Sequence, residues 1–253
     1  MKIFDLTGKI ALVTGSSQGI GLALAEGLAE AGAEIILNGR NKKKLDDASN
    51  RLKQNYKSIS VMQFDVTDHS VVTQKINEHY ASGERIDILV NNAGMQYRAP
   101  LENFPPEKFE LLMKTNVSSV FNVGQIVAQY MIKEGKGKII NIASVQTALA
   151  RPGIAPYTTT KGAVSNLTKG MATDWASKGL QVNAIAPGYF KTPLNAALVA
   201  DADFSSWLKK RTPAGRWGEV KELVGACIFL AASSSSFVNG QTIFVDGGIT
   251  ASL

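Results

Sequence analysis

Apolar segments typical of β-strands alternate along the whole chain with segments of helical periodicity, and this alternation is the strongest constraint on the fold. The strand-like segments are short and rich in Val and Ile, and they cover residues 9–13, 34–37, 60–64, 86–90, 138–142, 181–186 and 242–245. Helical periodicity covers residues 20–31, 43–54, 70–80, 106–131, 156–177 and 220–232. Alternation of this kind is typical of βαβ units, so it predicts a seven-stranded parallel sheet with helices on both faces.

The length of 253 residues suits one domain of this type, and no stretch of the chain resembles a linker. We therefore expect a single domain over residues 1–253. Residues 187–212 fit neither a strand nor a long helix. An irregular segment of this length inside a compact domain is usually functional, so we expect a small substrate lid at about residues 188–213, after the sixth strand.

The composition favours a soluble globular protein, with 45% hydrophobic and 19% charged residues. No apolar run approaches the roughly 20 residues that span a bilayer, and residues 1–9 lack a signal-peptide core. We expect a cytoplasmic protein with no membrane partner. The only cysteine, Cys227, lies in an apolar run, which predicts a buried free thiol.

The net charge of +6 raises the possibility of nucleic-acid binding, which needs basic residues gathered on one surface. Lys and Arg are instead spread along the chain, and the only dense cluster is residues 40–44. This cluster suits a small anion at least as well, so we expect no nucleic-acid partner. His69 and His79 lie ten residues apart beside a polar helix, a pattern that does not indicate a metal site.

The first strand leads directly into the glycine-rich turn Thr14-Gly15-Ser16-Ser17-Gln18-Gly19-Ile20-Gly21 and then into a helix. Glycines allow a sharp turn and close approach to a ligand, and free amides at a helix N-terminus attract a pyrophosphate. A strand before the turn and a helix after it are the context that dinucleotide binding requires. The residues that we expect to bind the cofactor here are Gly15, Ser17, Gln18, Gly19, Ile20 and Gly21.

Tyr157 and Lys161 are four residues apart in a predicted helix, which places a phenol and an ammonium on the same face. A nearby cation stabilises a phenolate and lowers its pKa from about 10, so that the tyrosine can exchange protons near neutral pH. A pair with this spacing also occurs by chance in many helices. Its meaning therefore depends on the other motifs.

Those motifs together resemble the short-chain dehydrogenases/reductases over essentially the whole chain. They are the glycine turn with spacing G-x-x-x-G-x-G, Asn91-Asn92-Ala93-Gly94, Asn116, Ser144, Tyr157-x-x-x-Lys161 and Pro187-Gly188. The resemblance implies an α/β fold, namely a single Rossmann-type doubly wound domain. It also implies an oxidoreductase that transfers a hydride between a nicotinamide cofactor and a carbonyl or alcohol carbon.

The resemblance also implies a role for each residue of a catalytic tetrad. Tyr157 is expected to act as the general acid/base, while Ser144 orients the substrate oxygen. Lys161 is expected to lower the pKa of Tyr157 and to contact the nicotinamide ribose. Asn116 is expected to hold a water that passes protons from Lys161 toward solvent. Hydride transfer requires such groups, because the oxygen gains or loses a proton as its carbon reacts.

Further cofactor contacts are implied at the ends of other strands. They are Asn91 and Gly94, Asp65 and Val66 beside the adenine, Tyr157 and Lys161 themselves, and Pro187, Gly188 and Thr192 around the nicotinamide. Asp65 could equally be a capping residue for the helix that begins near Asp68. Sites for NAD place a carboxylate at the end of the second strand, whereas this chain has Asn38-Gly39-Arg40. Arg40, followed by Lys42, favours the 2′-phosphate of NADP, with NAD as the alternative.

The segments expected around the substrate are polar and cationic, which favours a hydroxylated acid over a long acyl chain or a steroid. We expect the substrate to contact Gln96, Arg98, Ser144, Gln146, Arg151 and Tyr157. Within the family, the resemblance implies interconversion of D-gluconate and 5-keto-D-gluconate. The alternatives are a reductase of a neutral sugar, a polyol or a 3-oxoacyl thioester, and a binding protein that senses the cofactor without catalysis. The resemblance also implies a homotetramer.

Overall fold

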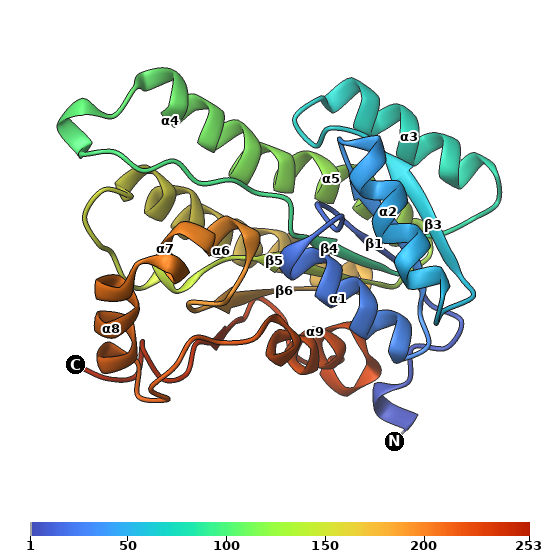
Figure 1. Ribbon diagram of the computed structural model, residues 1–253. Helices are drawn as coiled ribbons and strands as arrows, with labels where there is room; N and C mark the ends of the chain where they lie inside the picture. The colour runs from blue at the N-terminus through green and yellow to red at the C-terminus, as the bar shows by residue number, and fades with distance from the viewer. Residues whose placement is uncertain (1) are drawn as a thin grey trace.

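The computed structural model describes residues 2–253, which form one parallel sheet with helices on both faces (Figure 1). The sheet has the strand order β3-β2-β1-β4-β5-β6-β7, and every neighbouring pair is parallel. The strands are β1 (Ile10–Val13), β2 (Glu34–Gly39), β3 (Ile59–Gln63), β4 (Ile88–Asn91), β5 (Gly137–Ile142), β6 (Leu180–Pro187) and β7 (Thr242–Val245). The predicted seven-stranded, doubly wound sheet is therefore confirmed.

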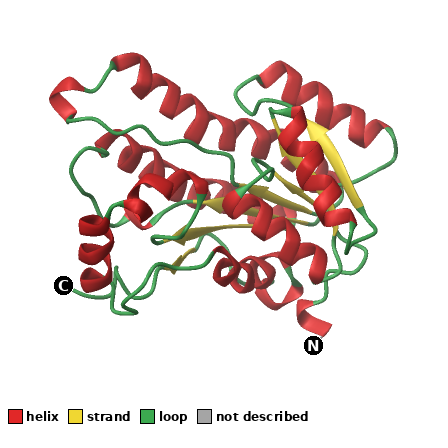
Figure 2. Cartoon of the chain, in the orientation of Figure 1, coloured by secondary structure: helices red, strands yellow, loops and turns green. Residues whose placement is uncertain are grey.

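Two groups of helices cover the two faces of the sheet (Figure 2). One face packs against α1 (Gly19–Glu30), α2 (Lys42–Lys53) and α9 (Val224–Ala231). The other packs against α3 (His69–Ala81), α5 (Ser119–Lys133) and α6 (Ala155–Trp175). Central strands β1 and β4 are buried along their whole length, which explains their continuous apolar or uncharged sequences. Cys227 is a buried free thiol, as predicted, and burial raises its pKa to about 12.

The helix predicted over residues 106–131 is instead two helices joined by a π-helical turn. Helix α4 covers Pro106–Met113, the π-helical turn covers Lys114–Ser118, and α5 follows at once. A π turn widens the helix and is frequent at functional sites. Apolar periodicity continues across such a turn, so the sequence pattern did not reveal it. Asn116 lies within it and is almost completely buried.

The segment after β6 contains the short helices α7 (Ala196–Ala200) and α8 (Ala202–Arg211). We call residues 188–213 the excursion. Aromatic packing attaches it to the rest of the protein, since Phe204 of α8 packs against Trp217 with ring centroids 6.1 Å apart. Within the excursion, Phe204 also packs against Tyr189 at 5.8 Å. The Trp217 indole donates a hydrogen bond to Ser205 Oγ at 3.1 Å. Within residues 2–253, no helix is both long and apolar enough to cross a membrane.

Candidate active site

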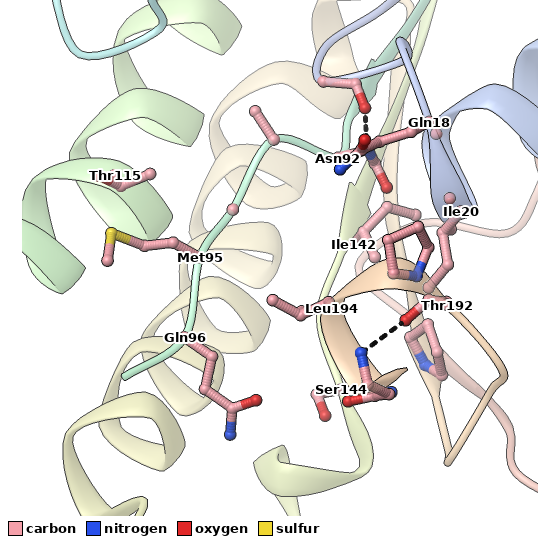
Figure 3. A pocket seen from close by; sticks show the side chains of 18 of the residues that line it. Gln18, Ile20, Asn92, Met95, Gln96, Thr115, Ile142, Ser144, Thr192 and Leu194 are labelled. Carbon is pink, nitrogen blue, oxygen red and sulfur yellow. Dashed lines mark hydrogen bonds between the residues drawn. The ribbon is translucent and has the colours of Figure 1, made fainter. Parts of the chain in front are cut away.

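A cavity of about 790 Å³ lies along the carboxyl ends of the central strands, where a doubly wound sheet binds its ligand. Its wall includes residues that follow β1, β2, β3, β4, β5 and β6, together with the start of the excursion. Figure 3 shows Gln18, Ile20 and Asn92 toward one end of the cavity and Gln96 and Ser144 toward the other. We call the part of the lining around Gln18, Ile20 and Asn92 the cofactor wall. We call the part around Gln96 and Ser144 the substrate wall.

The glycine turn forms the cofactor wall, and all six of its predicted cofactor-binding residues line the cavity. Gly15 has a φ of 62°, and a Cβ atom there would lie 2.8 Å from the Cα of Ala93. Gly21 is equally constrained, because its Cβ would lie 2.5 Å from the carbonyl oxygen of Gly15. Only glycine allows the turn to lie this close to the segment after β4.

Two side-chain amides that carried no predicted role, the buried Asn38 and the partly buried Asn92, hold this turn in place. Asn38 Oδ1 accepts a hydrogen bond from the backbone N–H of Gly15 at 3.3 Å. Asn92 Nδ2 donates to the carbonyl oxygens of Thr14 at 2.9 Å and Gly15 at 3.1 Å. The signal for Asn38 was present in the sequence, as an amide that directly follows the apolar run Ile35-Ile36-Leu37.

The structure corrects the prediction for Asn91, which does not line the cavity. Asn91 is still part of β4, and its Nδ2 donates to Asn141 Oδ1 of the neighbouring strand at 3.0 Å. The strand ends there, so the next residues, Asn92 to Gly94, are the ones that reach the cavity. Gly94 thus lies where it was predicted.

The expected anion site at the end of β2 forms from a different pair of basic residues. Arg40 lines the cavity, and its Nη1 lies 3.7 Å from Asp65 Oδ2. Lys42 turns away and pairs with Asp46 at 2.7 Å, because the two are one helical turn apart in α2. Lys44 takes its place, since it lines the cavity and its Nζ lies 3.4 Å from Gln18 Oε1.

Asp65 and Val66, which are predicted to lie beside the adenine, both line the cavity. The alternative role of Asp65 as a helix cap is wrong, because Asp68 caps α3 by accepting from Val71 N. Asp65 instead accepts hydrogen bonds from the backbone N–H and the hydroxyl of Thr67. Burial opposes ionisation of Asp65, but these bonds and the charge of Arg40 together hold its pKa below the usual value.

Ser144, Tyr157 and Lys161 come together at the substrate wall, whereas Asn116 lies behind it. Tyr157 and Lys161 share one face of α6, and Lys161 Nζ is 5.7 Å from the centre of the Tyr157 ring. Lys161 Nζ also donates to the carbonyl oxygen of Ile142 at 2.7 Å. Ser144 follows β5, its Oγ accepts a hydrogen bond from Gln146 N at 3.2 Å, and its side chain opposes the rise in the pKa of Tyr157.

Burial has the largest effect on the pKa of Tyr157, and the predicted effect of Lys161 stays a prediction. Burial raises the pKa of Tyr157 to about 12, although the side chain of Ser144 and the charge of Arg98 oppose this rise. Burial also lowers the pKa of Lys161 to about 8. Desolvation is the largest cause of both shifts, because the charged form of each group loses contact with water on burial.

The Asn116 side chain bonds to two segments of the protein. Its Oδ1 accepts from Met95 N at 2.8 Å, and its Nδ2 donates to Met95 O and to Thr160 Oγ1 at 2.9 and 3.1 Å. Thr160 Oγ1 in turn donates to the backbone carbonyl of Tyr157 at 2.7 Å. Asn116 thus connects the segment after β4 to the helix that carries Tyr157.

The four other residues predicted to contact the substrate all line the cavity: Gln96, Arg98, Gln146 and Arg151. Arg98 Nη2 donates to Gln96 Oε1 at 2.9 Å. Gln146 Nε2 lies 3.4 Å from the Tyr189 hydroxyl, and Gln146 Oε1 is buried without a hydrogen-bond partner among residues 2–253. Tyr189 thus belongs to this wall, in one of the segments expected around the substrate.

Pro187, Gly188 and Thr192 line the cavity where β6 enters the excursion, as predicted. A Cβ atom on Gly188 would lie 2.7 Å from the Cα of Asp246, so this position requires glycine. Thr192 Oγ1 accepts from the backbone N–H of Asn195 at 3.3 Å and begins a short 3₁₀ turn. These contacts shape the start of the excursion beside the catalytic residues.

Comparison with known proteins identifies the family. The family described as enoyl-(acyl carrier protein) reductase matches residues 15–250, nearly the whole chain. The chain belongs to the short-chain dehydrogenase/reductase family. This confirms the resemblance on which the tetrad was predicted. The family's glycine turn, Ser144 and Tyr157-x-x-x-Lys161 all meet at the cavity.

Several family members are similar to this chain along their full length. The gluconate 5-dehydrogenase of Gluconobacter oxydans (strain 621H) is 59% identical over 251 residues, which are 99% of this chain and 98% of that protein. The 5-keto-D-gluconate 5-reductase of Escherichia coli (strain K12) is 44% identical and covers 98% of this chain and 97% of its own. A gluconate 5-dehydrogenase from Burkholderia cenocepacia J2315, solved in complex with NADP and tartrate, is 57% identical. It superposes with a TM-score of 0.97, covering 100% of this chain and 99% of its own.

Proposed function

We propose that this protein is an NADP-dependent oxidoreductase that interconverts D-gluconate and 5-keto-D-gluconate. The observation that carries the proposal is the pair of arginines, Arg98 and Arg151, in the same cavity as Ser144 and Tyr157. A carbonyl-reducing centre beside two guanidinium groups suits a hydroxylated carboxylic acid. The similar proteins named for gluconate and 5-ketogluconate support the same substrate.

The cofactor wall fits a dinucleotide that carries a 2′-phosphate. Its glycine turn leaves no room for side chains, and α1 begins at Gly19 with amide groups that suit a pyrophosphate. Arg40 and Lys44 supply positive charge at the end of β2, where an NAD site would have a carboxylate. The neighbour solved with NADP supports this choice.

When bound, NADPH supplies the hydride for ketone reduction, and NADP⁺ accepts it in the reverse direction. Tyr157 donates its phenolic proton to the substrate oxygen as the carbon becomes an alcohol carbon. Ser144 donates a hydrogen bond to the same oxygen and stabilises the negative charge that develops there. A pKa of about 12 keeps Tyr157 protonated and ready to act as the acid.

Lys161 is the group next to Tyr157 that can return a proton to it. Its pKa of about 8 leaves it largely charged at neutral pH and still able to release a proton. Asn116 positions these groups through Thr160, and both of its amide hydrogens are already used in doing so. A water on Asn116 would therefore bind to a remaining oxygen lone pair. On the substrate wall, Gln96 and Gln146 suit the hydroxyl groups and the arginines suit the carboxylate.

The test is a reduction assay with NADPH and a matched panel of carbonyl substrates. We expect turnover of 5-keto-D-gluconate at a kcat/KM at least about tenfold above that of a neutral ketose or a 3-oxoacyl thioester. The reverse order would favour another reductase of the same family. Binding of NADPH without turnover of any substrate would identify a cofactor-sensing protein instead. Repeating the assay with NADH checks the cofactor preference.

We also propose a cytoplasmic homotetramer. Support for assembly comes from apolar side chains exposed on α4 and α5, where Phe109 and Phe121 are 41% and 44% exposed. Apolar surface of this kind often marks an interface between subunits. Light scattering at assay concentrations measures the assembly, and a mass equal to one chain of 27.0 kDa would contradict it.

A further inference from the structure

Arg151 is a partly buried cation whose Nε lacks, within the described chain, the hydrogen-bond partner that a buried N–H group normally has. Its Nε is buried and has no hydrogen-bond partner among residues 2–253. None of the ion pairs found in that part of the chain includes it. A buried guanidinium N–H without an acceptor is costly, and in a cavity wall it indicates an anionic ligand.

A residue of the excursion holds Arg151 in position without satisfying it. The guanidinium carbon lies 5.4 Å from the centre of the Phe204 ring in α8. A ring face attracts a guanidinium and fixes its plane, yet it leaves the N–H groups at the edge free. Phe204 is itself held by Trp207 and Trp217, with ring centroids 5.3 and 6.1 Å away.

Arg98 differs from Arg151 in its hydrogen bonding and in its effect on Tyr157. It already donates to Gln96 Oε1 at 2.9 Å, and its charge reaches the reacting phenol, where it lowers the pKa of Tyr157. Burial and the nearby charge of Arg151 lower the pKa of Arg98. The two arginines therefore repel each other, and an anion beside them would relieve that repulsion.

The chemistry of the substrate indicates which of the two arginines, Arg98 or Arg151, binds the carboxylate. The C1 carboxylate of 5-keto-D-gluconate is separated from the reacting C5 carbonyl by a chain of hydroxylated carbons. The carboxylate must therefore bind away from Tyr157, whereas Arg98 acts on Tyr157 directly. We propose that Arg151 binds the substrate carboxylate and that Phe204 is the positioning residue that orients it. This inference rests on the proposed function, and it makes the excursion the element that distinguishes an acid from its neutral counterpart.

L-Sorbose is a matched neutral substrate, because it has the same carbon chain and the same ketone with a hydroxymethyl group in place of the carboxylate. The variant Arg151→Gln should lower kcat/KM for 5-keto-D-gluconate by about 100-fold, mainly through KM, because it removes a charge-assisted contact. Its effect on L-sorbose should stay below about threefold, since no carboxylate is lost there. Each variant is compared with the wild type on the same substrate, so the open-chain fraction of each sugar cancels.

Phe204 is tested by its own pair of substitutions. Phe204→Leu keeps the apolar contact and removes the ring face, so KM for 5-keto-D-gluconate should rise by about fivefold to tenfold. Phe204→Tyr keeps the ring face and should restore the wild-type KM. Phe237→Leu is the matched control, because it removes a fully exposed phenylalanine ring that does not line the cavity. It should change KM by less than about threefold.

The outcomes separate the inference from the proposed function. If the wild type reduces neither sugar, the proposed function fails. If the wild type reduces 5-keto-D-gluconate but Arg151→Gln affects both sugars equally, only the inference fails. It fails equally if Arg98→Gln alone shows the acid-selective loss. Thermal denaturation with and without NADPH checks that each variant is folded. If Arg151→Gln does not fold, the Phe204 variants test whether Arg151 binds the carboxylate.

Discussion

The cofactor wall and the substrate wall of one cavity differ in how completely their polar groups are bonded. On the cofactor wall, Asn38 and Asn92 use their side-chain amides to hold the glycine turn. On the substrate wall, Gln146 Oε1 and Arg151 Nε are buried with no partner among residues 2–253. The first wall is thus complete by itself, whereas the second has polar atoms that only a ligand can satisfy.

This difference shows how the two walls contribute to stability. Hydrogen bonds on the cofactor wall stabilise the native protein, so their loss should lower both stability and cofactor binding. Unpartnered polar atoms on the substrate wall cost free energy until a substrate binds. Substitutions there should therefore lower activity without lowering stability, as is often seen at functional sites.

The largest effect should come from Tyr157, where the two walls meet. Tyr157→Phe removes the proton donor and leaves the ring, so kcat for 5-keto-D-gluconate reduction should fall by about 10³-fold. The affinity for NADPH, measured by fluorescence titration, should change by less than about threefold. A kcat within tenfold of the wild type would exclude Tyr157 as the acid.

A substitution in the glycine turn should break the cofactor wall itself. Gly21→Ala places a methyl group against Gly15 O and the Asn92 amide, so we expect a loss of about 2–4 kcal/mol in the free energy of unfolding and weaker NADPH binding. Gly170→Ala in α6 is the matched control, because its added methyl group meets nothing within 4 Å. That control should be neutral or stabilising by about 1 kcal/mol in urea denaturation.

The pH dependence should distinguish the two directions of the reaction. Tyr157 must be deprotonated to accept a proton, and its pKa lies far above neutrality. D-Gluconate oxidation should therefore rise by up to about tenfold per pH unit between pH 7 and 9. Reduction requires the protonated phenol, which persists throughout this range, so its rate should not rise. Parallel pH profiles for the two directions would contradict this assignment.

The choice of cofactor should depend on Arg40 and not on Lys42. Arg40→Glu replaces the cation with a carboxylate, so kcat/KM with NADPH should fall by about 10- to 100-fold while that with NADH changes little. Lys42→Glu introduces the same change of charge at a residue that does not line the cavity. It should alter the NADPH value by less than about threefold, which separates a direct contact from a general field.

The smallest expected effect is a change in the free energy of unfolding whose sign differs between the two walls. Gln146→Met keeps the volume and removes the unpartnered oxygen, so it should stabilise the protein by about 1 kcal/mol while raising KM for 5-keto-D-gluconate. Asn92→Leu on the cofactor wall removes bonded groups and should destabilise it by about 1–3 kcal/mol. Urea denaturation of both variants gives the comparison, and equal signs would contradict the distinction between the walls.

Much of the fold and site followed from local patterns in the sequence. Alternating periodicity predicted all seven strands, and the glycine turn and the spacing of Tyr157 and Lys161 predicted groups that do line one cavity. The π turn around Asn116 was not predictable in this way, because apolar periodicity continues through it. The sequence also did not distinguish between nearby residues of the same type. Asn92 and Lys44 line the cavity, whereas Asn91 and Lys42, which were predicted to bind the cofactor, do not.

The sequence by itself determined the parallel sheet, the dinucleotide-type turn and the shared face of Tyr157 and Lys161. Each of these depends on spacing within one segment, and spacing is visible in the chain. Only the tertiary structure decided which amide and which lysine face the cavity, and that burial raises the pKa of Tyr157. It also decided that Arg151 lies on Phe204 with no acceptor for its Nε among residues 2–253. These features depend on desolvation and on contacts between distant segments, which no local pattern records.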